Sequence, residues 1–176
     1  MRDRTRARIA EVKGKLATES DLTVVHRFNQ GATDVPTELP LAVQELLAET
    51  DGFHVGWISV PSAKRQSAVQ FYLDDPETMA TISREGDRWY VVGTLHDFPF
   101  LIEQGEGSIW WFSDLGRESF LDSPFERLAD DLDDFIVSYA LGSGYRRIFG
   151  ESADEWYAFL VRHGFASQRD SSHDRS

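Results

Sequence analysis

The side chains best suited to acid–base or metal chemistry in this sequence are a histidine and two carboxylates near its middle. His96 and Asp97 are adjacent, Glu103 follows six positions later, and His54 and His26 are further candidates. A histidine beside carboxylates can transfer protons or bind a metal ion. No HExxH motif, paired ligand spacing or nucleophile elbow accompanies them. We therefore expect no catalytic residue, no metal and no cofactor, and a small hydrolase centred on these residues is the least favoured alternative.

A second group of side chains could act by charge instead of catalysis. The segment from Ser123 reads as a helix, and at about 100° per residue its acids fall on one side, opposite the apolar face. Such a surface is either an ordinary solvated helix face, favoured near the N-terminus by the macrodipole, or a docking surface for a basic partner. An apolar residue in the same sector would be a contact within it. The candidates are Glu126, Asp130, Asp133, Asp134 and Val137.

Three tryptophans are candidates for a protein interface. Trp110 and Trp111 are adjacent on a predicted strand, so their side chains point to opposite faces of the sheet. One can lie in the core, and the other must be covered by a helix or exposed; Trp57 raises the same question. Packing in the core is one interpretation, because large rings fill cores well. An exposed aromatic beside acids is instead typical of an interface hot spot, so Trp57 and Trp110 join the candidate partner-binding residues.

The composition indicates a folded chain. Of its 176 residues, 41% are hydrophobic, including five Trp and twelve Phe, which is enough to bury the core of one domain. No apolar run approaches the roughly 20 residues that span a bilayer, and no charged-then-apolar leader begins the chain, so we expect a cytoplasmic protein. The absence of cysteine excludes disulfides, thiol catalysis and cysteine-ligated zinc.

The charge distribution bounds the kind of partner. The net charge of −12 argues against nucleic acid and against anionic membranes, because both are themselves negatively charged. It favours a basic protein partner. Residues 1–15 carry six bases and two acids, whereas residues 122–134 carry six acids and a single base, Arg127. This asymmetry is the strongest functional indication in the composition, and nothing in the sequence predicts the oligomeric state.

The chain divides into three parts that must position these residues. Residues 1–20 form a basic N-terminal segment, either a frayed helix or an arm, with one apolar side. Residues 21–165 form the α+β domain. Residues 166–176 are polar, and we expect this tail to be disordered. The apolar side of the first segment consists of Ile9, Val12 and Leu16.

An amphipathic helix that begins at Pro40 and ends at Gly52 opens the main part of the domain. Proline suits the first turn, and glycine suits the left-handed residue after the last turn. A strand follows at once, in which alternate residues are apolar. The inward side of the helix is Val43, Leu46, Leu47 and Thr50, and the strand alternates Phe53, Val55 and Trp57 with His54, Gly56 and Ile58.

Short strands and tight turns fill the middle of the chain. They predict a twisted, largely antiparallel sheet of about five or six strands. Gly93 indicates a bulge or a close backbone approach, and residues 77–83 could be a helical turn or an edge strand. The further predicted strands are 22–28, 68–73, 89–95, 98–103 and 108–112, with a hairpin turn at 105–107.

Two helices close the domain. Ser123-Pro124-Phe125-Glu126 is a capping box that would start the acidic helix, with an apolar face through Tyr139 and a stop at Gly142. A similar box at 152–155 would start a last helix that ends at Gly164 and turns Trp156, Phe159 and Leu160 inward. With the Pro40 and Ser123 helices packed against the sheet, the predicted fold is a single α+β domain.

The order of these elements resembles the SUKH superfamily. The Leu-Pro start, the Glu-Leu-Leu run, the Asp-Gly stop and the immediate strand of residues 39–60 resemble its opening motif, with Thr50-Asp51-Gly52 where the family usually has Asn-Gly-Gly. Residues 107–112 (GSIWWF) look like its glycine-led strand, and residues 120–125 (FLDSPF) like the small residue before its closing helix.

That superfamily groups a eukaryotic cell-wall-assembly regulator with many bacterial immunity proteins that neutralise toxins. The resemblance implies an immunity protein that binds a cognate toxin domain one-to-one and needs no chemistry of its own. The partner would be a basic protein, with affinity from a few apolar anchors and with acids that set the encounter rate. A regulatory scaffold that bridges several cellular proteins is the alternative.

Overall fold

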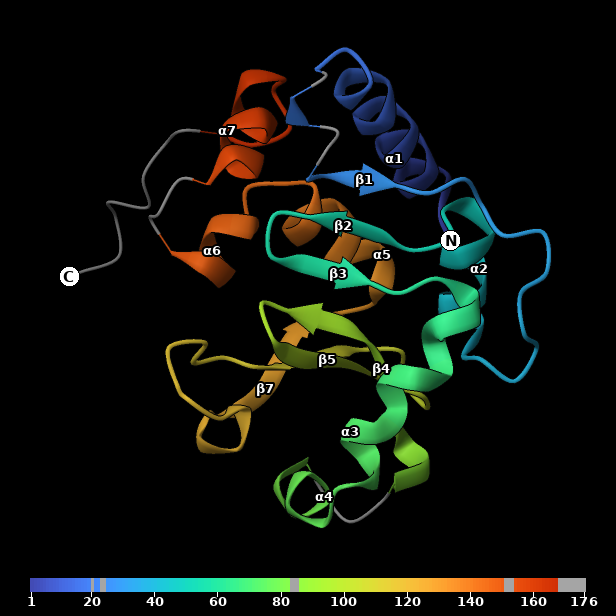
Figure 1. The fold of residues 1–176 in the computed structure, drawn as a ribbon, viewed down its shortest axis with the longest axis vertical. Helices are drawn as coiled ribbons and strands as arrows, with labels where there is room; N and C mark the ends of the chain where they lie inside the picture. Colours follow the sequence, from blue (N-terminus) through green and yellow to red (C-terminus); the bar gives the residue numbers. More distant parts are fainter. Residues whose placement is uncertain (20, 23–24, 83–85, 151–153, 168–176) are drawn as a thin grey trace.

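A single antiparallel sheet organises the molecule (Figure 1), seen in a computed structural model that describes residues 1–19, 21–22, 25–82, 86–150 and 154–167. Within these ranges the sheet has seven strands in the order β1 to β7, so every strand pairs with its neighbours in sequence. The predicted single α+β domain with an antiparallel sheet is confirmed, with seven strands where we expected five or six.

The strands follow the predicted pattern most closely in the centre of the sheet, where β4 and β5 form the longest pair. Gly93 marks a bulge, as predicted: the register of β4 against β5 shifts between Val91 and Gly93. A Cβ at Gly93 would lie 2.1 Å from the carbonyl oxygen of Ser59, so the predicted close approach also exists. The strands are β1 Arg27–Phe28, β2 Phe53–Val55, β3 Ile58–Val60, β4 Trp89–Leu95, β5 Phe98–Glu103, β6 Ile109–Phe112 and β7 Phe125–Ala129.

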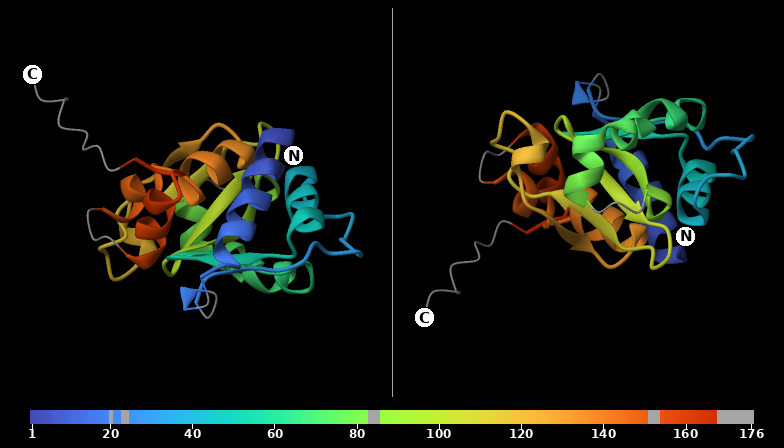
Figure 2. Two further views of the ribbon diagram at one scale, coloured as in Figure 1. Left: turned by 90° about the horizontal axis from the view of Figure 1, so that it is seen from above. Right: turned by 90° about the horizontal axis from the view of Figure 1, so that it is seen from below.

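Helical segments cover both faces of the sheet, and Figure 2 shows α1 lying alongside α2. Alternation along each strand divides the core. Phe100, Ile102 and Trp111 face the side of α1, α2 and α7, whereas Leu101 and Phe112 face the side of α3 and α4. The segments are α1 Asp3–Leu16, α2 Leu41–Glu49, the 3-10 helix η2 Ala63–Gln70, α3 Phe71–Asp74, α4 Pro76–Ile82, η3 Gly86–Arg88, η4 Phe120–Asp122, α5 Leu132–Asp134, the π-helix η5 Phe135–Ala140, α6 Tyr145–Phe149 and α7 Glu155–Arg162.

The N-terminal segment is part of the core. Ile9, Val12 and Leu16 line the buried side of α1, as the pattern predicts, and Ile9 and Val12 are fully buried. The helix is therefore neither frayed nor a free arm. Its three apolar side chains remove too much surface from water to leave the helix detached.

The strand predicted at 68–73 is wrong, because this stretch belongs to η2 and α3. β3 pairs with β4 only near Leu95 and Thr94, which leaves the other half of that β4 edge without a strand. Side-chain amides take over: Gln70 accepts from the Val91 N–H at 3.1 Å and donates to the Val91 carbonyl at 2.9 Å. Gln66 donates to the Val92 carbonyl at 3.4 Å, so a helical segment with two glutamines substitutes for the missing strand.

Two other predicted elements change length or type. The strand predicted at 22–28 contains only Arg27–Phe28 among the described residues. The segment at 77–83, left open between helix and strand, is helical as α4 Pro76–Ile82. Pro76 stands at its first position, where a missing N–H is not needed.

The helix predicted to start at Ser123 is also wrong. Residues Phe125–Ala129 form β7 and pair with β6, because the open edge of β6 offers backbone hydrogen bonds that a helix there would leave unmade. The Ser123 hydroxyl accepts from the Asp114 N–H at 2.7 Å instead of capping a helix. The helix starts later, where Asp131 accepts from the Asp134 N–H.

The last helix is confirmed over Glu155–Arg162, with Asp154 as its N-cap and with Trp156, Phe159 and Leu160 fully buried. Ser152 and Ala153 of the predicted box lie outside the described residues. Of the tail predicted to be disordered at 166–176, residues 168–176 also lie outside the described residues, whereas Ala166 and Ser167 are described and donate hydrogen bonds to Leu160 and Ser143. None of the described helices is both long and apolar enough to cross a membrane.

We predict that Ile9→Ala lowers the free energy of unfolding by about 2–5 kcal/mol, because it leaves a cavity in a fully buried site. Urea denaturation followed by circular dichroism measures the change. Glu11→Ala on the exposed side of α1 is the matched control, with a change within about 0.5 kcal/mol. Equal stabilities of the two variants would show that α1 is not part of the core.

Candidate protein-binding surface

Trp57 lies in the turn of the β2–β3 hairpin with half of its surface (50%) exposed. The strand predicted through Ile58 is therefore interrupted, and Gly56 and Trp57 form a two-residue turn. Gly56 has a φ of +53°, a conformation that glycine adopts without strain. A Cβ there would lie 1.9 Å from the hydroxyl oxygen of Tyr145. Glycine is thus required both by the turn and by the side chain beneath it.

Two buried polar side chains fix the backbone of this turn. The Gly56 N–H donates to His26 Nδ1 and the Trp57 N–H donates to the Tyr145 hydroxyl, each at 3.0 Å. The Tyr145 hydroxyl in turn donates to Asp154. Burial lowers the pKa of His26, which keeps its ring neutral and able to accept. Burial is the main cause that raises the pKa of Tyr145, and the hydrogen bond to Asp154 raises it further, so the phenol keeps its proton.

The neighbouring β4–β5 turn completes the support from the side. The His96 N–H donates to the Trp57 carbonyl at 2.6 Å, and the two rings lie 4.9 Å apart. His96 has a φ of +57°, a left-handed conformation that costs of order 1 kcal/mol for a residue with a side chain. Asp97 follows with its carboxylate exposed, 3.3 Å from His96 Nδ1. We call Trp57, His96 and Asp97 the Trp57 surface.

This arrangement suits binding more than catalysis. An exposed indole whose backbone is fixed loses little conformational freedom when a partner covers it. The ring can pack against an apolar side chain or a cation, and Asp97 can pair with a basic group. His96 and Asp97 entered the sequence prediction only through the least favoured hydrolase alternative; the structure places them beside Trp57, a candidate partner-binding residue.

Glu103 does not join His96 and Asp97. It lies at the opposite end of β5, so that at about 3.3 Å per residue the six steps from Asp97 amount to about 20 Å. Its carboxylate is buried and bonded to Arg88 and to the Ser108 hydroxyl. The structure therefore separates the three residues of the hydrolase alternative. Within the described residues no group of three or more histidines, cysteines or acids could hold a metal ion.

His54 and His26 belong to the β1–β2 edge. His54 is half-buried on β2, opposite Arg27, and burial lowers its pKa. A pocket of about 330 Å³ lies nearby, between α1 and β1. Among the described residues, its lining is basic and apolar and contains no carboxylate. It is lined by Lys13, Leu16, Ala17, His26, Arg27 and Phe28. It offers no acid–base pair for catalysis.

The acidic candidates do not share one helix face, so that prediction is wrong. Glu126 is exposed on β7, Asp130 follows the strand, and Asp133 and Asp134 lie in α5. Val137 is buried and cannot be an apolar spot on the surface. Its predicted exposure followed from a helix phase counted from Ser123, and that helix starts eight positions later.

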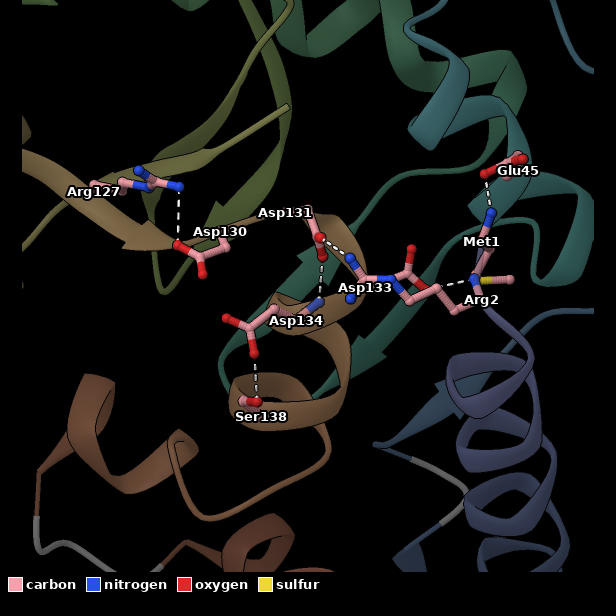
Figure 3. A network of polar contacts seen from close by, with 9 residues as sticks. All are labelled: Met1, Arg2, Glu45, Arg127, Asp130, Asp131, Asp133, Asp134 and Ser138. Carbon is pink, nitrogen blue, oxygen red and sulfur yellow. Dashed lines mark hydrogen bonds and ion pairs between the residues drawn. The ribbon is translucent and has the colours of Figure 1, made fainter. Parts of the chain in front are cut away.

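The acids around α5 have partners within the chain (Figure 3). Arg127 donates to Asp130 at 2.9 Å, and the Ser138 hydroxyl donates to Asp134 at 2.7 Å. The Arg2 backbone N–H donates to Asp133 at 2.8 Å, while its guanidinium binds Asp131. The terminal ammonium of Met1 pairs with Glu45 on α2. The basic N-terminal segment and the acidic segment thus partly neutralise each other.

Trp110 and Trp111 lie on opposite faces of the sheet, as predicted. Trp111 is buried on the α1 side. Trp110 is half-buried on the other side, where its ring packs against Phe125 and Trp89, and its indole N–H donates to the Ser108 hydroxyl at 2.9 Å. Trp110 is therefore mainly a packing residue, and Trp57 is the more exposed of the two tryptophan candidates.

No motif in the sequence marks Tyr145, although it determines the position of the Trp57 turn. Its role depends on α6 passing beneath a hairpin 88 residues away in the chain. The only local signal is Gly56, whose place between two apolar strands is compatible with a tight turn. We had interpreted that glycine as part of a continuous strand.

In a comparison with models of known protein families and with curated proteins, no family model and no curated protein matches this chain.

We predict that Tyr145→Phe lowers the free energy of unfolding by about 1–3 kcal/mol, because it leaves the Trp57 N–H and the Asp154 carboxylate without their shared partner. The variant should also broaden the NMR signal of the Trp57 indole. Tyr139→Phe is the control, since the Tyr139 hydroxyl has no hydrogen-bond partner in the described ranges. An unchanged Trp57 signal in Tyr145→Phe would contradict the supporting role.

We predict that Glu103 stabilises the folded protein at pH values above 4.5, the ordinary pKa of a glutamate carboxyl. Burial raises the pKa of Glu103, but the bonds from Ser108 and Arg88 lower it and prevail. Because the folded pKa lies below the unfolded one, this contribution is complete above 4.5 and is lost as the pH falls through the folded value.

Urea titrations at a series of pH values test this linkage. Glu103→Gln should be less stable than the wild type at neutral pH, and the difference should shrink on acidification. Glu106→Gln, in the exposed turn after β5, should retain the pH dependence of the wild type. A difference that stays constant down to acid pH would refute the contribution.

Proposed function

We propose that this protein binds one basic protein partner stoichiometrically and, as the resemblance to the SUKH superfamily implies, acts as an immunity protein that neutralises a toxin domain. The partner would lose access to its own substrate or target while it is bound. No residue of this chain needs to do chemistry. The proposal places the complex in the cytoplasm, where a toxin domain delivered to the cell would act.

The observation that carries the proposal is the rigid presentation of Trp57. Buried His26 and Tyr145 hold the backbone of its turn, and His96 holds its carbonyl from the neighbouring turn. These interactions fix the backbone of a residue whose side chain remains half exposed. Because exposing an indole is unfavourable in an isolated protein, so much support for its exposure favours a role in recognition.

The charge of the chain supports a basic partner. The net charge is −12, and Asp97 beside Trp57 has 91% of its side chain exposed. A field of this sign accelerates encounter with a positively charged protein and orients it. Association should therefore slow as salt screens the field, while the contact at Trp57 acts mainly on dissociation.

We predict that Trp57→Ala weakens binding of the partner by about thirtyfold or more, the effect of losing a hot-spot side chain. The tagged protein is used to capture its partner from a lysate of the source cells at low salt. The stoichiometry of the complex is measured by native mass spectrometry, and the affinity by titration of the purified partner. Leu41→Ala removes another exposed apolar side chain, on α2, and should bind like the wild type.

The capture also separates the proposal from its alternative. One basic polypeptide held one-to-one, and lost in Trp57→Ala, agrees with an immunity protein, and a direct assay of the captured protein with and without its inhibitor then tests neutralisation. Several partners held weakly would favour the regulatory scaffold. Equal affinity of Trp57→Ala and wild type would refute the assignment of the site.

A further inference from the structure

A second exposed aromatic lies close to the Trp57 surface. Phe71, at the start of α3, is 58% exposed and stacks on Tyr72 with ring centroids 4.2 Å apart. The Tyr72 hydroxyl donates to the carbonyl of Asp97 at 3.3 Å. A continuous series of contacts therefore leads from Trp57 through His96 and Asp97 to Phe71. Two exposed rings flank one exposed carboxylate.

Tyr72 joins three elements at this edge. Besides Phe71 and Asp97, it contacts Phe120 of η4 in an edge-to-face arrangement at 5.6 Å. Burial, with the charge of Asp97, raises the pKa of Tyr72, so its hydroxyl remains a donor. Figure 1 shows α3 and α4 beside β4 and β5, on the side of the sheet away from α1 and α7. The position of Phe71 is thus fixed by packing.

The segments that meet at Tyr72 are strongly acidic. Residues 71–77, the 96–97 turn and residues 113–124 together hold seven acids and one base, Arg117. Arg117 donates to Asp114 at 2.7 Å, so the single base is already paired. The acids are Asp74, Asp75, Glu77, Asp97, Asp114, Glu118 and Asp122.

Three of these acids differ from those around α5. Asp74, Glu118 and Asp122 are exposed, and in the part of the chain that the structure describes their carboxylates have no hydrogen bond or ion pair. Asp130, Asp131, Asp133 and Asp134 each have a partner within the chain. Asp74 belongs to α3, which carries Phe71, and Asp122 belongs to η4, which contacts Tyr72, so unpartnered negative charge lies on the segments that adjoin the exposed aromatics.

We propose that Phe71 and the acids of α3 and η4 extend the Trp57 surface into one docking site for a protein segment in which Lys or Arg side chains alternate with apolar ones. This inference rests on the proposed function and names its partner chemistry. The apolar side chains cover Phe71 and Trp57, whose rings also attract cations. The basic side chains pair with the exposed carboxylates of Asp97, Asp74 and their neighbours.

The test uses a short peptide in which arginine and leucine alternate, with a matched peptide in which glutamate replaces arginine. Two-dimensional NMR spectra of the whole protein follow the titration. The arginine peptide should shift the amide signals of Phe71, Asp74 and Asp97 and the indole signal of Trp57 together, and high salt should suppress the shifts. The glutamate peptide should shift none of them.

Matched variants inside and outside the proposed docking site test which residues bind the arginine peptide. Phe71→Ser and Asp74→Asn should each weaken binding of the arginine peptide by about fivefold or more. Leu41→Ser on α2 and Glu106→Gln in the turn after β5 change exposed residues outside the proposed site and should bind like the wild type. Shifts centred on residues 126–134, or spread evenly over all acids, would overturn the inference.

The outcome is separable from that of the proposed function. If the captured protein partner depends on Trp57 but binds Phe71→Ser and Asp74→Asn like the wild type, the proposed function stands and this docking site is wrong. If the arginine peptide maps to the site but no stoichiometric partner exists, the site stands and the immunity function is wrong.

Discussion

A single buried hydroxyl connects the parts of this protein that matter for recognition. Tyr145 accepts from the Trp57 N–H and donates to Asp154, and Asp154 accepts from the Tyr157 N–H as the N-cap of α7. The β2–β3 turn, α6 and the start of α7 therefore share one polar contact inside an apolar environment. Such a contact is strengthened by its largely apolar surroundings, and its loss would leave the Trp57 N–H and the Asp154 carboxylate without this partner.

Charge is divided between two tasks. Around α5 the acids stabilise the fold: Asp131 caps the helix, and Asp131 and Asp133 bind Arg2 of the N-terminal segment. The packing of Ile9 and Val12 brings that segment to them. At the α3–η4 edge, Asp74, Glu118 and Asp122 have no hydrogen bond or ion pair in the part of the chain that the structure describes, whereas Asp75 accepts from Thr78 and Asp114 pairs with Arg117. The same composition thus supplies both internal stabilisation and a field directed at solvent, and only the second suits recognition of a basic protein.

Much of the fold was predictable where one period dominates the pattern. The strands of 89–95 and 98–103, the bulge at Gly93 and the inward face of the last helix follow from spacing alone, since alternation or helical repeats there have no competing interpretation. The pattern failed at 68–73 and 123–129. In both places an apolar repeat fits either a helix or a strand. Residues 125–129 became a strand on the open edge of β6, whereas 68–73 stayed helical and the Gln70 side chain bonds to the edge of β4.

The sequence by itself determined the α+β class and the antiparallel order of the central strands, because these depend on local periodicity, short turns and composition. It also marked Trp57 as a residue that lies either in the core or exposed at an interface. The tertiary structure decided where the acids lie, that Val137 is buried, that Glu103 is separated from His96, and that Tyr145 supports Trp57. The physical reason is distance along the chain: Arg2 meets Asp133, and Trp57 meets Tyr145, across separations of 131 and 88 residues, which no local pattern encodes.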